Sequence, residues 1–252
     1  MSCASARRTR RVLLAALLWA VPVPALATEP PSATEVLRRV DRFRGFARPY
    51  RFRARVERRG SAARGAARSM IEVRTDGRAG QLITVLEPTR GDRILRRDGE
   101  MWLRPRNLHR LTRLPPELRL FGGAAISDVA AVDLLHDYEG RARPESCQGS
   151  ADYVLDLVPR GRGGRYAKGV LVVECGRWAP RRLELMTRSG KTLKVIAYAD
   201  VMPVLDGEIA TRLEIEDAVT RDASTVRLFD FAYLTPGETR SLTPEYLLSM
   251  RP

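Results

Sequence analysis

The residues that most often carry catalysis are few in this sequence, and their spacing does not suit an active site. Only two histidines occur, His109 and His136, and neither belongs to a metal-binding pattern such as H-E-x-x-H. Asp128 and Asp133 lie five positions apart, off the i,i+4 spacing of one helical face, so helix capping or solvation explains them better than paired acid–base catalysis. The sequence also has no G-x-S-x-G nucleophile motif. We therefore expect a protein that is not an enzyme and that uses no metal or other cofactor.

Two cysteines flank a predicted β-hairpin. Cys147 precedes the apolar run 153–158, and Cys175 follows the run 169–174, so the two thiols lie at the open ends of the hairpin. In an oxidising compartment such thiols most often pair, and no C-x-x-C redox motif is present. We expect a structural disulfide that stabilises the fold by roughly 3–4 kcal/mol through loop entropy.

The segment 102–113, WLRPRNLHRLTR, concentrates positive charge beside a tryptophan. The period of a strand places Met101 and Leu103 on one face and the alternating residues on the other. We expect the arginines to lie on the solvent side of a curved sheet and to dock on anionic lipid headgroups or on an acidic exporter surface. The predicted docking residues are Trp102, Arg104, Arg106, Arg110 and Arg113.

The N-terminus has the three parts of a secretory signal peptide. Four arginines within residues 7–11 precede the apolar run 12–21, and Ala25-Leu26-Ala27 fits the small-x-small cleavage rule. The run is too short for a stable membrane anchor. We expect cleavage between Ala27 and Thr28 and a periplasmic protein with one domain, residues 28–252. The general secretory route is favoured over the twin-arginine route, which residues 9–14 also resemble.

The charge of the chain is basic almost entirely through arginine. The net charge is +14, with 44 lysines and arginines of which only three are lysines, and removal of the leader leaves +10. Such a charge invites a polyanion as partner, but the arginines are spread over the whole length. Export also separates the protein from cytoplasmic DNA and RNA. We expect no nucleic-acid partner and keep an anionic membrane surface as a candidate.

Two helices are predicted, one before the first strand and one in the middle of a long series of strands. Ser32 and Glu35 form a capping box before an apolar stripe that ends near Gly45. Residues 127–136 form the second candidate helix, and Thr243-Pro244 starts a short C-terminal turn. Alternating apolar and charged residues, separated by Gly and Asp-Gly turns, predict antiparallel strands with one dry face. These strands are residues 51–57, 70–73, 81–87, 93–95, 101–106, 153–158, 169–174, 181–187, 192–201, 208–216 and 224–233.

Three stretches of the sequence carry a family resemblance. Residues 99–105 are similar to an M-W-L-Y-x-P strand, residues 127–134 fit S-D-x-x-x-x-D-L, and residues 166–247 follow the family order of strands to an F-T-x-x-Y-L ending. With these motifs the chain resembles the outer-membrane lipoprotein-sorting-like proteins, the LolA/LolB-like periplasmic family. It departs at Val129, Ala131 and Leu242, where the family usually has aromatic residues.

The resemblance implies a mainly β (α+β) fold. That fold is a strongly bent antiparallel sheet, an unclosed β-barrel, whose concave side is covered by helices. It also implies that acyl chains of lipoproteins or other lipids are held between the sheet and the helical lid, in outer-membrane sorting or beside a membrane exporter.

Three classes of function follow from these observations. The first is a periplasmic carrier of lipoproteins or lipids with an apolar cleft. The alternative is an accessory or sensor protein that binds an inner-membrane exporter or a signalling protein without carrying lipid. An enzyme is the third and is not favoured. For each lining residue, ordinary core packing is the competing interpretation. The candidate lipid-binding residues are Val36, Leu37, Val40, Leu82, Met101, Leu103, Val132, Leu155, Leu157, Leu183, Leu185, Leu213 and Ile215.

Overall fold

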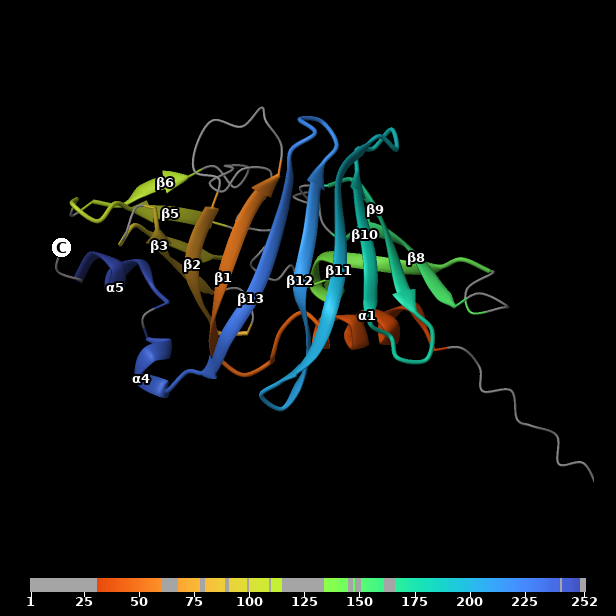
Figure 1. Ribbon diagram of the computed structural model, residues 1–252, viewed down its shortest axis with the longest axis horizontal. Coiled ribbons are helices and arrows are strands. Elements are labelled where there is room, and N and C mark those ends of the chain that lie inside the picture. Colours follow the sequence, from red (N-terminus) through yellow and green to blue (C-terminus); the bar gives the residue numbers. More distant parts are fainter. Residues whose placement is uncertain are drawn as a thin grey trace, which may run out of the picture. The chain divides into compact units, whose positions relative to one another are not determined.

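Thirteen antiparallel strands form one sheet in the described part of the chain (Figure 1). The structure is a computed structural model that describes residues 31–59, 68–77, 80–88, 91–98, 100–108, 110–114, 134–144, 147, 151–160, 166–240 and 242–249. The chain divides into two units, residues 1–30 and 31–252, and all the described residues belong to the second. The predicted leader, Gly99, His109 and Val132 lie outside the described residues.

The sheet consists of two meanders joined by one long-range strand pair. One meander contains β1 (Tyr50–Arg59), β2 (Arg68–Thr75), β3 (Gln81–Glu87), β4 (Arg93–Arg97), β5 (Glu100–Arg104) and β6 (Thr112–Leu114). The other contains β7 (Tyr138–Ala142), β8 (Asp152–Pro159), β9 (Lys168–Glu174), β10 (Pro180–Met186), β11 (Thr192–Val204), β12 (Gly207–Asp217) and β13 (Ala223–Tyr233).

Strand β1 pairs with β13, so the strand order runs from β6 through β1 and β13 to β7. Strands β6 and β7 are the two ends of this order, and the sheet does not close into a barrel. This architecture confirms the predicted mainly β fold with an unclosed antiparallel sheet. The period of two is clear in β1, where Phe52, Ala54 and Val56 are buried and the arginines between them are partly exposed.

One helix packs on the inner face of the sheet, where the sequence predicts it. Helix α1 (Ala33–Arg42) starts at the N-cap Ser32, whose hydroxyl accepts a hydrogen bond from the amide of Glu35 at 3.3 Å. Its apolar stripe, Val36, Leu37 and Val40, is fully buried. The helix contacts β7 and β12 as well as the short helix α3 (Leu134–Asp137).

Only the last part of the second predicted helix lies in the described chain. The amides of Leu134 and Leu135 at the start of α3 donate to the carboxylate of Asp41 on α1, at 3.2 and 2.9 Å. This contact satisfies two amides that α3 itself leaves without helical partners and ties α3 to α1.

The C-terminal residues pack on the other, outer face of the sheet. Helix α4 (Pro236–Thr239) begins with a capping box, and α5 (Pro244–Ser249) begins at Pro244 as expected. Leu242 and Leu247 from this segment are buried with Leu82 of β3 and Leu95 of β4 in a second, small apolar cluster. The main core lies on the inner face.

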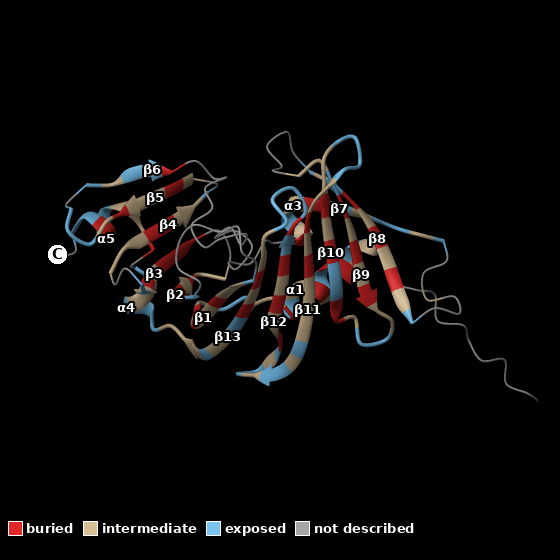
Figure 2. Ribbon diagram, turned by 45° about the horizontal axis from the view of Figure 1, so that its top comes forward, coloured by how far each residue is buried: buried red, intermediate tan, exposed pale blue. Residues whose placement is uncertain are grey.

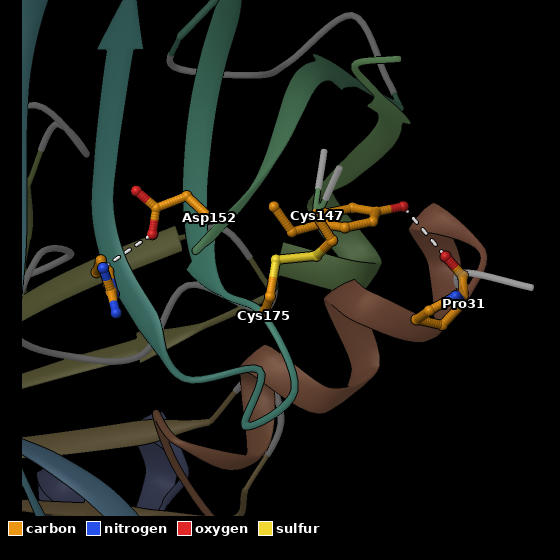
Figure 3. Close-up of a disulfide and its surroundings, with 6 residues drawn as sticks. Pro31, Cys147, Asp152 and Cys175 are labelled. Carbon is orange, nitrogen blue, oxygen red and sulfur yellow. Dashed lines mark hydrogen bonds and ion pairs between the residues drawn. A yellow bond between two sulfur atoms is a disulfide. The ribbon is translucent and has the colours of Figure 1, made fainter. Parts of the chain in front are cut away.

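The predicted disulfide is confirmed. Cys147 and Cys175 are bonded, with Cα atoms 5.9 Å apart, at the open end of the β8–β9 hairpin (Figure 3). Beside this bond the hydroxyl of Tyr153 donates to the carbonyl oxygen of Pro31 at 3.1 Å. Pro31, just before α1, is thereby attached to the disulfide-bonded β8–β9 hairpin. No helix of the described residues combines the length and the apolar character needed to cross a membrane.

Candidate functional site

The inner face of the sheet brings together most of the predicted lining residues. They come from α1 and from strands of both meanders, and each is at most 6% exposed (Figure 2). Leu103 packs on the same cluster but is only partly buried. Ten of the predicted residues are in this core: Val36, Leu37, Val40, Met101, Leu155, Leu157, Leu183, Leu185, Leu213 and Ile215.

The placement of Leu82 differs from the prediction. Leu82 is buried, but it belongs to the outer cluster beneath Leu242 and Leu247, whereas its neighbour Ile83 faces the main core. Strand β3 is apolar on both faces because α5 covers its outer side. Alternation by itself therefore does not indicate which of two adjacent apolar residues faces inward.

The prediction that Arg104 lies on the solvent side is wrong. Arg104 is fully buried. Trp102 packs against the outer cluster, which contains Leu242 and Leu247 of the C-terminal segment. Arg97 of β4 helps to hold that segment, since its guanidinium donates to the carbonyl oxygen of Leu242 at 2.9 Å. Arg93 lies opposite Arg104 in the sheet. Burial is the main cause that lowers the pKa of Arg93, and the positive charge of Arg104 acts in the same direction.

The other three predicted docking residues remain at the surface. Arg106, Arg110 and Arg113 are exposed, and we call them the basic edge. Of these three arginines, Arg113 forms an ion pair with Glu100. The basic edge is therefore smaller than the sequence predicts and does not include the tryptophan.

An open pocket of about 560 Å³ lies at one end of the strands. It is formed by α1, the connection from α1 to β1, the β11–β12 hairpin and the β9–β10 turn. Its lining residues are Glu35, Arg39, Arg42, Phe43, Gly45, Phe46, Ala47, Arg177, Asp206, Gly207 and Glu208.

Ion pairs organise the charged rim of this pocket. Arg39 donates to Glu35 at 2.9 Å, and Arg177 donates to Glu208 at 2.6 Å. The Arg39 guanidinium, together with Arg38, lowers the pKa of Glu35. Each of these carboxylates is therefore neutralised by an arginine, and the exposed Arg42 adds a further positive charge.

Aromatic rings connect the pocket to the main core. Phe46, which lines the pocket, makes an edge contact with Tyr50 at 5.1 Å between ring centroids and with Phe231 at 6.4 Å. Phe231 in turn stacks on Phe52 at 5.5 Å. Tyr50 and Phe52 are buried in the core, whereas Phe46 and Phe231 are only partly buried. We call these four residues the aromatic row.

A β-bulge turns Phe231 inward. The register of β13 against β1 shifts between Arg51 and Arg53, and Asp230 has a φ of +55°. Phe229 and Phe231 are two positions apart and would otherwise share one face, but the extra residue places Phe231 beside Phe52. Sequence reasoning missed this row. Its only signal is that Phe46, Tyr50 and Phe52 lie within seven residues of an otherwise aromatic-poor chain.

Burial of the aromatic row also affects its one buried tyrosine. Desolvation raises the pKa of Tyr50 to about 12, even though the nearby Arg44 acts in the opposite direction. Tyr50 is therefore neutral across the physiological range.

Among the described residues, no three His, Cys, Asp or Glu side chains gather in a way that could hold a metal ion. The arrangement suits an amphiphile, with charge at the rim and apolar surface behind it.

A family model described as “-like: Uncharacterized protein” matches residues 77–248, more than half of the chain. No curated protein matches the sequence.

Solved structures share the fold along nearly their whole length. A LolA superfamily protein from Nitrosomonas europaea has a TM-score of 0.75 at 24% identity, covering 86% of this chain and 100% of its own. An outer membrane lipoprotein-sorting protein domain from Vibrio parahaemolyticus has a TM-score of 0.70 at 16% identity, covering 86% and 98%. A DUF1329 family protein from Desulfovibrio piger has a TM-score of 0.68 at 14% identity, covering 84% and 98%. The fold described above is therefore LolA-like.

Proposed function

We propose that this protein, which belongs to the family whose model matches residues 77–248 and has a LolA-like fold, is a periplasmic carrier of lipids or of the acyl chains of lipoproteins. The observation that carries the proposal is the aromatic row, which leads from an open, charged pocket to the apolar inner face of the sheet. A lipid has the same order of parts, with a polar headgroup and an apolar tail. The fold shared with the LolA superfamily protein from N. europaea and with the outer membrane lipoprotein-sorting protein domain from V. parahaemolyticus supports this proposal.

In the proposed complex the headgroup stays at the pocket and the acyl chain follows the aromatic row toward the residues between α1 and the sheet. A chain of 14–16 carbons contributes about 10 kcal/mol at ~0.8 kcal/mol per CH₂ before the costs of binding. The predicted lining residues are packed together in the structure. Acyl-chain binding therefore requires α1 to move away from the sheet far enough to admit the chain.

Replacement of Phe231 by alanine tests this path. Phe231→Ala removes the ring that links Phe46 to Phe52, so we expect the Kd for a fluorescent fatty-acyl probe to rise about tenfold or more. Phe229→Ala is the matched control, because Phe229 lies on the same strand beneath Arg55 on the outer face. Thermal unfolding checks that both variants fold. Equal probe affinity in the two variants would exclude the aromatic row as the path of the acyl chain. Protein that carries no lipid in native mass spectrometry and binds no acyl probe would exclude the carrier.

The basic edge is proposed as a contact with anionic headgroups or with an acidic surface of an inner-membrane exporter. Charge reversal at Arg106, Arg110 and Arg113 changes exposed side chains, so the fold should remain intact. We expect the triple Glu variant to lose binding to exporter-containing membranes while it keeps its affinity for the acyl probe. Unchanged binding to both membranes and partner would remove the basic edge from the proposal.

A second candidate function is an accessory or sensor protein that binds an exporter or signalling protein without carrying lipid. The observation in its favour is that the described inner face is filled by side chains of its own core. Cross-linking in intact cells separates the two functions. A stable protein partner recovered without lipid supports the accessory role, whereas a co-purified lipid supports the carrier.

A further inference from the structure

The tip of the β11–β12 hairpin exposes aliphatic side chains beside the pocket. Met202 is 52% exposed and Leu205 is 45% exposed, and Pro203 between them is also exposed. The hairpin reaches past the neighbouring strand ends at the bottom of Figure 1, and its tip is pale blue in Figure 2. Leu205 has a φ of +52°, a conformation that favours glycine. The turn therefore displays a large apolar residue where a small or polar one would fold more easily.

The base of this hairpin is held firmly, although its tip projects. The amide of Ala210 donates to the carbonyl oxygen of Phe43 at 2.9 Å, next to the end of α1. The hydroxyl of Tyr233 donates to the carboxylate of Asp206. A Cβ on Gly207 would lie 3.3 Å from the ring of Phe46, so the backbone passes close to that ring. The tip is thus presented in a defined position relative to the pocket.

Positive charge exceeds negative charge at the pocket beside the tip. Arg38, Arg39, Arg42, Arg48 and Arg177 lie at or beside the pocket, against the three carboxylates of Glu35, Asp206 and Glu208, which leaves an excess of two positive charges. Arg48 is 67% exposed and lies over the ring of Tyr233, 4.0 Å from its centroid. Aliphatic side chains at a tip, with aromatic rings and arginines behind them, match the layers of a lipid surface.

We propose that the β11–β12 hairpin tip docks this protein on an anionic phospholipid bilayer. Met202 and Leu205 enter the boundary between headgroups and acyl chains, and Arg42 and Arg48 contact the lipid phosphates. The pocket then opens at the membrane surface, where a lipid can pass to the aromatic row. This last step rests on the proposed carrier function, whereas the docking itself does not. The site is distinct from the basic edge, which lies on β6 and the segment before it.

The full chain is expressed in a host that exports it, and the exported protein is purified. The test measures binding of this protein to vesicles that contain phosphatidylglycerol and phosphatidylcholine. We expect Met202→Ser with Leu205→Ser to weaken vesicle binding about tenfold. Val158→Ser with Val219→Ser is the matched control. These two residues are 45% and 56% exposed. Val158 lies near the end of β8 and Val219 in the turn after β12, both at the end of the strands away from the hairpin tip. Equal loss in both double variants would overturn the proposal, since it would show hydrophobic adsorption without a defined site.

Three further measurements sharpen the result. A tryptophan introduced by Met202→Trp should shift its emission to shorter wavelength on these vesicles, and one introduced by Val219→Trp should not. Vesicles of phosphatidylcholine alone should bind weakly, and salt should reduce binding to the anionic ones. Loss of vesicle binding in the basic-edge triple variant but not in the tip variant would overturn the proposal and assign docking to the basic edge.

The same variants distinguish docking from carriage. The tip variant should bind the fluorescent acyl probe in free solution as well as the unmodified protein does. If the probe fails to bind while vesicle binding depends on the tip, the carrier function fails and the docking site stands. If the probe binds and vesicle binding does not depend on the tip, the docking site fails and the carrier stands.

Discussion

Arg104 and Arg106 are two residues apart and have the same side chain, but their surroundings give them different roles. Arg104 is fully buried opposite Arg93, whereas Arg106 is exposed. A buried arginine is held by its hydrogen bonds and packs with its long stem, so its removal affects the fold first. An exposed arginine is available to a partner and contributes little to stability.

Alanine substitution separates these two roles. Arg104→Ala should lower the free energy of unfolding by about 2–4 kcal/mol, because it leaves a cavity and disturbs a buried polar contact. Arg106→Ala should change it by less than about 0.5 kcal/mol. Urea denaturation followed by circular dichroism measures both values. Similar stability of the two variants would contradict the structural role assigned to Arg104.

At the scale of elements, the short helix α5 covers outer-face residues of β3, β4 and β5 and thereby removes them from the surface. Leu247 of α5 is fully buried with Leu82 and Leu95, whereas the next residue, Leu248, is 47% exposed. The outer face of these strands would otherwise expose a leucine patch and the ring of Trp102. Helix α5 thus covers Trp102, a residue of the basic segment that alternation predicts to face solvent.

Adjacent leucines provide the corresponding test. Leu247→Ala should destabilise the protein by about 2–4 kcal/mol, because it opens a cavity in the outer cluster, and it should increase the exposure of Trp102. Leu248→Ala should have little effect. Urea unfolding gives the stability, and quenching of tryptophan fluorescence by acrylamide gives the exposure. Unchanged quenching in Leu247→Ala would mean that α5 does not protect the tryptophan.

At the scale of the whole molecule, the long-range pairing of β1 with β13 joins two meanders into one open sheet. Tyr50 lies opposite Tyr233, so segments more than 180 residues apart in the chain are neighbours. The pocket, the aromatic row and the hairpin tip all lie at the end of the sheet where β1 starts and β13 ends. The pocket and the aromatic row are each built from segments that are far apart in the sequence.

Compartment and stability should be linked through the disulfide. We expect the full chain to be exported, cleaved after Ala27 and oxidised at Cys147 and Cys175, and residues 28–252 made in the cytoplasm to remain reduced. The reduced form should be less stable by roughly 3 kcal/mol. N-terminal sequencing and urea unfolding measure both effects. The Cys147→Ser, Cys175→Ser variant is the control, because its stability should not depend on the compartment.

The sequence by itself determined the features that depend on local pattern. Period-two alternation predicted most of the strands, the capping box at Ser32 predicted α1, and the cysteines at the ends of one hairpin predicted the disulfide. These features follow from neighbours along the chain. The order of motifs also indicated the LolA-like fold.

Only the tertiary structure decided which face of a strand meets another part of the chain. Leu82 packs on the outer face against Leu242 and Leu247, which lie at least 160 residues away in the sequence, and Arg104 is fully buried although alternation predicts that it is exposed. Phe231 faces inward because a single bulge at Asp230 reverses the alternation of β13. The pocket exists because three stretches that are far apart in the sequence meet at one end of the strands: residues 35–47, Arg177 and residues 206–208. Alternation predicts which residues of a strand share a face. The contacts that bury that face come from distant parts of the chain, so alternation alone does not predict which face is buried.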